Sequence, residues 1–455
     1  MIAILNIGKR PWAVPVILAI VTLAIRLPIT LSAKNLSPED TWRYVLTARN
    51  LVEHQVFSDK NGPFWPTAHD TPGYPMFLAC LFCLVPDQNI ALRAAMICNA
   101  LLFFVSAWLL YFLALALTDN RKLALASAIL FSFVPDTFWV PLQPMPDGVF
   151  ATLFLSSSLA AVRHWKTGNP RWLLASACLL AVAVLFKPIG AFYAPLLFVG
   201  AAIFGKKRWW LHFAAAIALY AAVLSPWYVR NWQTFGAFGL CTIAGTNLWQ
   251  WNCKLFAMEG GRVGNPGDLM AAESAVLATL PKTVPENPFL RSHAFGTAAV
   301  KFILRQPWEY LRFAAVRHIY LYRDNGAPNF ASFTQGTDAA IRFMAVRYQS
   351  TPEPISPETK CILLVSLIFT IVLWGLFFFA VMGAFSIVIT RNWLACGALL
   401  VPVFYFAALI GPVIFTRYRY QMIPFLAVLA VLGFSSMPKI FLKRRVEVTV
   451  EIAPD

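Results

Sequence analysis

The sequence predicts an all-α polytopic membrane protein, and three observations support this fold class. Of its 455 residues, 59% are hydrophobic and only 13% are charged, whereas soluble domains carry roughly 25% charged residues. The mean hydropathy is +0.64. The apolar residues gather in long runs, and a helix needs about 20 of them to cross a bilayer. Such runs, joined by short basic connections, are typical of a protein with many membrane-spanning helices.

About ten apolar runs are candidate membrane-spanning helices. They cover residues 11–31, 89–117, 122–141, 147–163, 171–186, 189–205, 209–226, 361–389, 393–414 and 421–437. The first run follows two basic residues, as in a signal peptide, but it is long and lacks an A-x-A cleavage site. We therefore interpret it as a retained membrane span.

Lysine and arginine residues predict the orientation of these spans. With alternating spans, the basic clusters all fall on one side of the membrane: Lys9 and Arg10; Arg121 and Lys122; Arg163, Lys166 and Arg171; Lys206, Lys207 and Arg208; Arg391; Lys439, Lys443, Arg444 and Arg445. The connection 135–146 lies on the other side and has no Lys or Arg. The positive-inside rule makes the basic side cytoplasmic, so we expect both termini there.

The net charge of +16 is explained by these clusters, which lie beside apolar runs. Basic residues at a membrane surface attract anionic lipid head groups, and the lipid bilayer is the expected partner. The basic residues form no continuous stripe of the kind that binds nucleic acid, so we expect no nucleic-acid partner.

The topology divides the chain into three predicted regions. Residues 1–226 form an N-terminal transmembrane catalytic region, which includes a first extracytoplasmic loop at 32–88. Residues 227–360 form a second, larger extracytoplasmic loop region, and residues 361–455 hold the last spans and a short cytoplasmic tail.

The second loop is expected to be mixed in structure. Residues 298–323 are amphipathic, basic and aromatic, which predicts a helix lying in the membrane interface. Residues 324–360 are rich in Pro, Gly, Thr and Asn and predict a mobile loop. Cys241 and Cys253 also fall in this region, where they either pair in an oxidising space or remain two free thiols.

The first loop contains two adjacent acids, Glu39 and Asp40, directly after Ser37 and Pro38. Ser as N-cap, Pro at the first helical position and acids in the first turn are typical of a helix start. One interpretation is that the acids only stabilise this helix end. The other is that one carboxylate projects into a cavity under the outer loops and acts as a general base, with Tyr44 on the same helical face.

Three motifs, in order along the chain, resemble the GT-C superfamily of membrane glycosyltransferases. The first is the first-loop acid with a Tyr four residues on, followed by TPGYP at 71–75. The second is SPWYVRNWQTFGAFGLCTIAGTNLWQWN at 225–252, and the third is RYRYQMIPFLAVLA at 417–430. The chain is similar to bacterial aminoarabinose transferases and to dolichyl-phosphate-mannose protein mannosyltransferases.

The resemblance implies a helical bundle with extracytoplasmic loops in the bacterial plasma (inner) membrane, with its active site on the extracytoplasmic side. It implies transfer of a sugar from a polyprenyl-phosphate or polyprenyl-diphosphate donor to a glycolipid, polysaccharide or protein acceptor. Asp40 matches the acid that serves as catalytic base, and Glu39 is its less favoured neighbour. The chemistry fits, because a hydroxyl nucleophile needs a carboxylate to take its proton near neutral pH.

The leaving phosphate requires cations, and a planar guanidinium suits it. Candidates are Arg230, Arg417, Arg419 and Lys187, for which the alternative is a side chain that extends to the interface, strongest for Arg419. Asp147 is either a substrate or metal contact or a helix N-cap. The further predicted substrate-binding residues lie in or beside the motifs: Tyr44, His69, Asp70, Tyr74, Asn231 and Asn247.

No cofactor is predicted with certainty. A divalent metal would draw on Asp40, His69, Asp70 and Asp147, but no spacing signature supports such a site. The alternative function is a membrane transporter or flippase of lipid-linked substrates. Transporters place ionisable groups near the bilayer midplane, whereas the spans predicted here are nearly free of charge, with Arg26 as the exception.

Overall fold

The computed structural model describes residues 13–203, 209–259, 266–281, 286–347 and 357–450, and these form helices and connections without a β-strand. The first half contains α2 (Ala13–Ser32), α3 (Thr41–His54), α4 (Gly73–Leu84), α5 (Gln88–Thr118), α6 (Arg121–Phe133), η1 (Pro135–Phe138), η2 (Val140–Leu142), α7 (Asp147–Thr167), α8 (Pro170–Phe186), η3 (Pro188–Tyr193), α9 (Ala194–Ile203) and α10 (Trp209–Phe235). The second half contains α11 (Ile243–Asn247), η4 (Leu248–Cys253), α12 (Lys254–Glu259), α13 (Pro266–Ala278), α14 (Pro288–Arg305), α15 (Pro307–Arg323), α16 (Ala327–Gln335), α17 (Thr337–Arg347), α18 (Pro357–Ile389), α19 (Trp393–Ala395), η5 (Cys396–Leu400), α20 (Val401–Ile410), α21 (Thr416–Arg419), η6 (Tyr420–Met422) and α22 (Ile423–Val450).

The chain is a multi-pass membrane protein, but the prediction of about ten spans is not confirmed. Helices form at every predicted span. Within the described residues, five are long and apolar enough to cross a membrane, and a bent pair makes up to six. The five are Gln88–Thr118, Trp209–Phe235, Pro357–Ile389, Trp393–Ile410 and Thr416–Met437. The bent pair is α6 with the segment Pro135–Leu142, which turns by 65° where Val134 meets Pro135.

Helix α7 is not among the candidate spans because it is polar for a membrane helix. Its serine and threonine hydroxyls instead form hydrogen bonds with neighbouring helices. Ser157 Oγ lies 3.0 Å from Ser176 Oγ on α8, and Thr152 Oγ1 lies 2.7 Å from Ser106 Oγ on α5. Small hydroxyl residues allow helices to approach closely and hydrogen-bond in an apolar environment. Helices α8 and α9 fall short for another reason, since they have only 17 and 10 residues.

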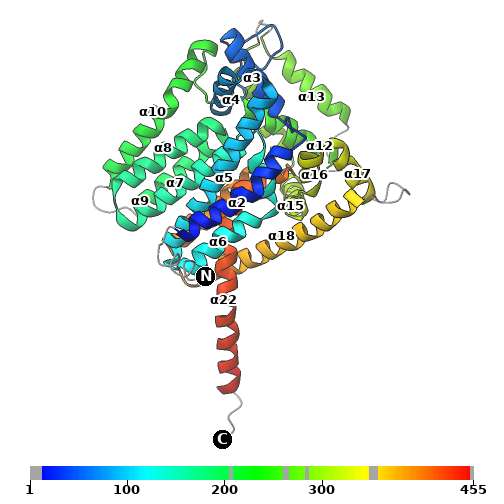
Figure 1. Ribbon diagram of the computed structural model, residues 1–455. Helices are drawn as coiled ribbons and strands as arrows, with labels where there is room; N and C mark the ends of the chain where they lie inside the picture. Colours follow the sequence, from blue (N-terminus) through cyan, green and yellow to red (C-terminus); the bar gives the residue numbers. More distant parts are fainter. Residues whose placement is uncertain (1–12, 204–208, 260–265, 282–285, 348–356, 451–455) are drawn as a thin grey trace.

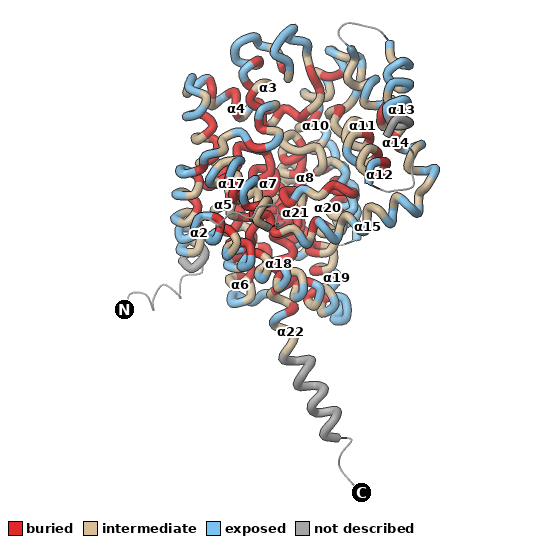
Figure 2. Tube along the Cα trace, turned by 90° about the vertical axis from the view of Figure 1, so that its right-hand side faces the viewer, coloured by how far each residue is buried: buried red, intermediate tan, exposed pale blue. Residues whose placement is uncertain are grey.

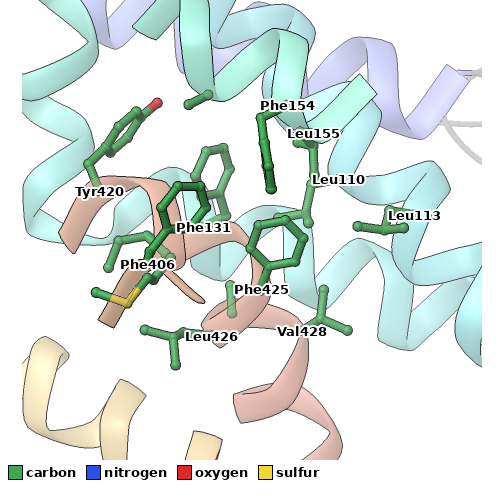
Figure 3. Packing of buried hydrophobic residues seen from close by; sticks show 14 of the residues in the cluster. Leu110, Leu113, Phe131, Phe154, Leu155, Phe406, Tyr420, Phe425, Leu426 and Val428 are labelled. Atoms are coloured by element: carbon green, nitrogen blue, oxygen red, sulfur yellow. The ribbon is translucent and has the colours of Figure 1, made fainter. Parts of the chain in front are cut away.

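The core lies between α5, α6, α7, α20 and α22, where aromatic rings pack together. Phe154 contacts Phe406 at 5.0 Å and Phe425 at 6.0 Å between ring centroids. Figure 3 shows these rings with Phe131 and Tyr420 around one apolar centre. In Figure 2 the buried residues form a continuous zone through the middle of the bundle. Aromatic pairs in such edge-to-face geometry add stability beyond their buried area.

Helices α18 and α22 approach each other through two glycines. A Cβ atom at Gly383 would overlap the carbonyl oxygen of Leu429, and one at Gly433 would overlap that of Phe379. Small residues at such crossings let two backbones pack directly in a membrane. This contact fixes α22, whose N-terminal end adjoins the residues of the candidate site.

The two regions predicted as extracytoplasmic loops are largely helical and contact each other. The backbone N–H of Thr242 donates to the carbonyl of Ala68 at 2.8 Å. The predicted interfacial helix at 298–323 is two helices, α14 and α15, because Pro307 begins a new helix. The prediction of a mobile loop at 324–360 is wrong for its first part, which forms α16 and α17; residues 348–356 lie outside the described residues.

Several helix ends lie on one side of the bundle. Helix α2 begins and α22 ends on the side of the bundle away from α3 and α4 (Figure 1). Lys166 at the end of α7 pairs with Asp119 beside α6 at 3.1 Å, so these two basic connections share one side. The predicted basic positions Lys9, Arg10, Lys206, Lys207 and Arg208 lie outside the described residues. Cys241 and Cys253 are both free thiols.

Candidate active site

The side chains of the two first-loop acids make no capping bond to a helix. The predicted start at Ser37–Pro38 is wrong, since α3 begins at Thr41 and its N-cap Asp40 makes no side-chain capping bond. Glu39 has a left-handed backbone (φ 49°), which is uncommon for a residue other than glycine. This local turn directs two consecutive carboxylates toward the same partner. Strained backbone of this kind is often found at functional sites.

That partner is Arg417 on the short helix α21. Its guanidinium lies 2.8 Å from Glu39 Oε2 and 2.6 Å from Asp40 Oδ2. The Arg417 side chain is buried, and its Nε has no acceptor among the described residues. It also lies beside Tyr418, with 5.0 Å between the guanidinium carbon and the ring centroid. The first and third sequence motifs therefore meet in space.

Two further ion pairs flank this centre. Arg43 on α3 makes a bidentate contact with Asp70, at 2.5 and 3.1 Å. Lys187 after α8 lies 2.7 Å from Asp147 at the start of α7. Four carboxylates and three cations thus form one cluster from the first loop, α7, α8 and α21. Gln421 joins it by donating to Asp147 at 3.1 Å.

The four carboxylates differ strongly in accessibility. The exposed fraction of the side chain is 36% for Asp40, 25% for Glu39, 9% for Asp70 and 3% for Asp147. A hydroxyl group arriving from outside therefore reaches Asp40 most easily. Asp147 is held inside the protein by Lys187 and Gln421. The N-cap alternative for this residue is wrong, because it is the first residue of α7 and Pro146 is the N-cap.

The two consecutive acids also differ in acidity. Burial alone raises the pKa of Asp40, but the charge and hydrogen bond of Arg417 and the charge of Arg43 outweigh it, so the pKa is lowered. For Glu39, burial outweighs Arg417, and the pKa is raised with a contribution from Asp147. Asp40 is therefore ionised at neutral pH and loses its proton more readily than Glu39.

Aromatic and neutral polar groups complete the site. Tyr44 and Tyr74 are buried and pack edge to face at 5.6 Å. Asn99 Nδ2 lies 3.5 Å from the Tyr74 hydroxyl and donates at 2.5 Å to the carbonyl of Gln143. Burial lowers the pKa of His69, which is therefore neutral near pH 7. These groups line the cluster without adding charge.

A separate ion pair between Arg419 and Asp136, which the sequence did not predict, anchors the helix that carries Arg417. Arg419 and Asp136 are both fully buried and bonded twice at 2.7 Å. The alternative that Arg419 extends to the membrane interface is therefore wrong. Arg419 also donates to the carbonyls of Leu321 and Asp324, both at 2.6 Å. An acid within a long apolar run was the available signal, since such residues are usually paired.

Arg26 on α2 has a related role. It is fully buried and donates to the carbonyls of Ser132 (2.5 Å) and Thr137 (3.3 Å), where α6 breaks. Its guanidinium lies 3.9 Å from the ring centroid of Phe103. Arg26 therefore satisfies the backbone groups that the bend leaves without helical partners. Arg43 and Gln421 are two further site residues that the sequence did not indicate.

The predicted residues of the second motif make their hydrogen bonds outside the acid cluster. Arg230 on α10 donates to the carbonyl of Thr67 and to Asn231 Oδ1, both at 2.8 Å. Asn231 is buried and donates to the carbonyls of Gly239 and Leu240, so its amide holds the turn after α10. Asn247 ends α11, and its carbonyl accepts from Asn252 at 3.4 Å. No described contact joins these residues to Asp40.

The described residues contain no group of three or more His, Cys, Asp and Glu that could hold a metal ion. Asp40, Asp70 and Asp147 each face a basic side chain instead of converging. The residues proposed for a metal from the sequence therefore do not fit one in this arrangement.

Comparison with known proteins supports the resemblance seen in the motifs. Residues 69–229 match the family model described as dolichyl-phosphate-mannose-protein mannosyltransferase. This segment includes His69, Asp70, Asp147 and Lys187 of the site. No curated protein matches the chain significantly in sequence.

The fold is similar to that of several solved proteins. An archaeal oligosaccharyltransferase from Archaeoglobus fulgidus, solved with an inhibitory peptide and a dolichol-phosphate, matches at TM-score 0.54 and 15% identity, over 98% of this chain and 52% of that chain. Its apo form matches at TM-score 0.52 and 14% identity with the same coverage. ArnT from Cupriavidus metallidurans bound to undecaprenyl phosphate matches at TM-score 0.42 and 15% identity, over 92% and 77%. The chain spans about half the length of the oligosaccharyltransferase chains it matches.

Proposed function

We propose that this chain, whose residues 69–229 match the family model described as dolichyl-phosphate-mannose-protein mannosyltransferase, is a membrane glycosyltransferase with Asp40 as its general base. It takes a sugar from a polyprenyl-phosphate-linked donor. The acceptor is a glycolipid, a polysaccharide or a protein on the extracytoplasmic side. The lipid bilayer is its environment, and the bacterial inner membrane is its expected location.

The observation that carries this proposal is the position of Asp40. It is the most exposed of the clustered carboxylates, and its pKa is lowered by Arg417. A general base must be ionised and within reach of the proton that it takes. The other three acids are less exposed.

In the proposed reaction, the acceptor oxygen bonds to the anomeric carbon while its proton passes to the Asp40 carboxylate. The bond from the anomeric carbon to the phosphate oxygen breaks, and its electron pair leaves with the carrier phosphate. Arg417 and Lys187 lie in the same cluster and stabilise that leaving charge. Planar guanidinium groups bind phosphate in a bidentate way, and the free Nε of Arg417 offers one further donor.

The alternative of a transporter or flippase requires a correction to the sequence argument. The spans are not nearly free of charge, because Arg26, Asp136 and Arg419 are buried within the bundle. Each of them, however, is fixed by several hydrogen bonds to the protein. Groups held in this way fit a structural role, whereas the more accessible carboxylates gather beside α3, which favours the transferase.

The first test is the Asp40→Asn substitution in the full chain, assayed with a radiolabelled polyprenyl-phosphate sugar in membranes. Asn keeps the size of the side chain but cannot take the proton, so transfer should fall by on the order of 10²–10⁴-fold. Donor binding should remain nearly unchanged.

Glu39→Gln is the matched control and should reduce transfer far less, because Glu39 holds a proton more readily. If purified Asp40→Asn transfers sugar within about threefold of wild type, where general bases give at least about 100-fold, Asp40 is not the base. Uptake of labelled donor into vesicles without any transfer would instead support the transporter.

A further inference from the structure

The segment 321–333 makes hydrogen bonds both to α21, which carries Arg417, and to the first loop just before the two acids. It comprises the end of α15, the turn that follows and most of α16. Most of it lies in the region that the sequence predicted as a mobile loop. The mechanism proposed above assigns no role to its side chains, although the segment connects the two halves of the Asp40–Arg417 contact.

Two sets of contacts join this segment to α21, one at each end of the short helix. Asn329 on α16 donates to Thr416 Oγ1 at 3.0 Å, and Arg419 donates to two carbonyls at the end of α15 and just after it, both at 2.6 Å. Thr416 and Arg419 are three residues apart and both buried, so they share one face of α21. Arg417 follows Thr416 by one residue, which turns its side chain by about 100° toward another face, where it contacts the two acids.

The same helix α16 also contacts the first loop. Asn329 and Ser332 are three residues apart and therefore lie on one face of α16. Asn35 Nδ2 donates to Ser332 Oγ at 3.3 Å, and the backbone N–H of Lys34 donates to the carbonyl of Phe333 at 3.2 Å. The Asn35 side-chain oxygen accepts from the backbone N–H two residues further on, at 3.2 Å, which fixes the start of the turn that leads to the acids.

Arg419 alone does not determine where Arg417 lies. A four-residue helix is not stable by itself, and an anchor at Arg419 leaves its other end free to turn. Thr416 lies at that other end, next to Arg417, and its buried hydroxyl accepts from Asn329. The Asn329–Thr416 bond therefore supplies the second fixed point that α21 needs to hold the Arg417 guanidinium in place.

We propose that Asn329 is a positioning residue of the transfer reaction. By binding Thr416 it keeps α21 on the helix that also binds the first loop, and so keeps Arg417 against Asp40. This inference rests on the proposed function, because only there does the Arg417–Asp40 contact take part in a reaction. In the contacts described, Asn329 touches no carboxylate or cation of the cluster and acts through Thr416.

The first test measures sugar transfer by the full chain in membranes, with the radiolabelled polyprenyl-phosphate sugar as donor. Asn329→Ala and Thr416→Val each remove one partner of the bond, so each should lower the transfer rate at saturating donor about threefold to tenfold, the usual effect of one neutral hydrogen bond. Thr416→Ser keeps the hydroxyl and should transfer like wild type. Thr334→Val is the matched control and should also transfer like wild type, because the Thr334 hydroxyl bonds within α16, to the carbonyl of Phe330 at 2.8 Å.

The double variant tests whether the two side chains act through one bond. Asn329→Ala with Thr416→Val should transfer no more slowly than the slower single variant, because the second substitution removes a bond that is already lost. A double variant whose loss is the product of the two single losses overturns the pairing.

The acid limb of the rate profile distinguishes positioning from a loss of folded protein. Arg417 is the strongest of the influences that lower the pKa of Asp40, so displacing it should move the limb to higher pH in both single variants. Fewer folded molecules would instead lower the rate without moving the limb, and an unshifted limb overturns the inference. The other charged groups that face Asp40 are unsubstituted in these variants: Arg43, His69 and Glu39.

Hydrogen exchange followed by mass spectrometry tests the contact without sugar transfer. Asn329→Ala should lose protection in peptides from residues 33–42 and 413–422, while peptides from α5 and α7 keep it. Unchanged exchange in both peptides overturns the inference, and so does a loss of protection throughout the chain, which would make the role of Asn329 purely structural. Transfer within about twofold of wild type in both single variants, less than one hydrogen bond contributes, also overturns it.

The result is distinguishable from a failure of the proposed function. If Asp40→Asn abolishes transfer while Asn329→Ala leaves both transfer and exchange unchanged, the base stands and the positioning role fails. If Asp40→Asn transfers like wild type while Asn329→Ala loses both protection and transfer, Asp40 is not the base and the positioning of Arg417 by Asn329 still stands.

Discussion

Arg417 contacts two consecutive carboxylates, Glu39 and Asp40, whose pKa values are shifted in opposite directions. Its Nη2 contacts Asp40 at 2.6 Å and its Nη1 contacts Glu39 at 2.8 Å. Asp40 has additional help from Arg43 at 3.6 Å. The pKa of Asp40 is therefore lowered while that of Glu39 is raised. Opposite shifts in neighbouring acids are a pattern that often separates catalytic roles.

The pH dependence of transfer should report this arrangement. Asp40 must be ionised to act as base, so activity falls as the pH drops through its pKa, which lies below the ordinary value of 3.8. In Arg417→Gln the main lowering influence is absent and burial raises the pKa. The acid limb of the rate profile should then move to higher pH, with weaker donor use. The measurement is the transfer rate between about pH 3.5 and 8.

Arg417→Lys is the companion variant. It keeps the positive charge near Asp40 but loses bidentate geometry. Its acid limb should stay close to that of wild type while donor use is only partly restored. An Arg417→Gln protein with an unshifted limb and unchanged donor dependence would remove Arg417 from the site and Asp40 from the role of base.

At this scale the sequence predicted part of the site. Asp40, Glu39, Asp147, Lys187 and Arg417 were chosen from motifs, and the structure brings them together. Arg43 was missed because its importance depends on Asp70, 27 residues away, and Asp136 was missed because it depends on Arg419, 283 residues away. No periodicity in a single sequence reveals such distant pairs. Arg230 was predicted beside the donor phosphate with Arg417, and that assignment remains a prediction.

Among the elements, the four-residue helix α21 depends most on tertiary contacts. It is too short to be stable alone, and Arg419 anchors it to Asp136 on η1 and to carbonyls at the end of α15. The bend between α6 and η1 places Asp136 inside the bundle, with Arg26 satisfying the bend. One buried ion pair, together with the hydrogen bonds of Arg26, therefore sets the position of Arg417.

Asp136→Asn should strongly destabilise the protein. It leaves the fully buried Arg419 without a countercharge, and breaking a buried ion pair costs about 3–5 kcal/mol. The midpoint of thermal unfolding in detergent should fall clearly. Asp119→Asn is the control, because Asp119 is 81% exposed opposite Lys166 and such exposed pairs contribute at most about 1 kcal/mol.

The double variant Asp136→Asn with Arg419→Gln tests whether the loss comes from the pair. Removing both charges should recover part of the stability, because no unpaired charge stays buried. If the double variant is as unstable as the sum of the two single variants, the two side chains do not act together.

Whole elements were more predictable than their ends. The apolar runs gave helices at every expected place, because hydrophobic length is a direct signal. The break of α6 at Pro135 and the helices α16 and α17 were not expected. In α16, Pro328 occupies an early helical position, and Gly326 and Gly336 border the helix. Proline and glycine in this segment indicate a loop when only the sequence is considered, although they also occur at helix ends.

On the scale of the whole molecule, α3, which follows Asp40 and carries Arg43, lies on the side of the bundle away from the start of α2 and the end of α22 (Figure 1). The positive-inside rule then predicts that the site faces away from the cytoplasm. The division into 1–226, 227–360 and 361–455 stays a prediction. Helix α10 crosses its first boundary, since it continues to Phe235.

The orientation can be measured with a cysteine at Asn61, in the exposed part of the first loop. In a variant with the eight native cysteines replaced, Asn61→Cys should react with a membrane-impermeant maleimide in intact cells. A cysteine at Arg391, between α18 and α19, should react only after permeabilisation. The reverse pattern would invert the topology and exclude an extracytoplasmic site.

The pairing of Asp40 with Arg417 also has a consequence for how the protein is made. The two residues are 377 positions apart, and at about 5–20 residues per second a ribosome needs roughly 20–75 s to pass from one to the other. During that time α3 is already outside the ribosome while neither acid has Arg417 beside it, and Asp136 lacks Arg419 in the same way. The nascent chain therefore carries part of its future site without the partner guanidiniums, open to chaperones and proteases, until its α21 segment emerges and completes these ion pairs.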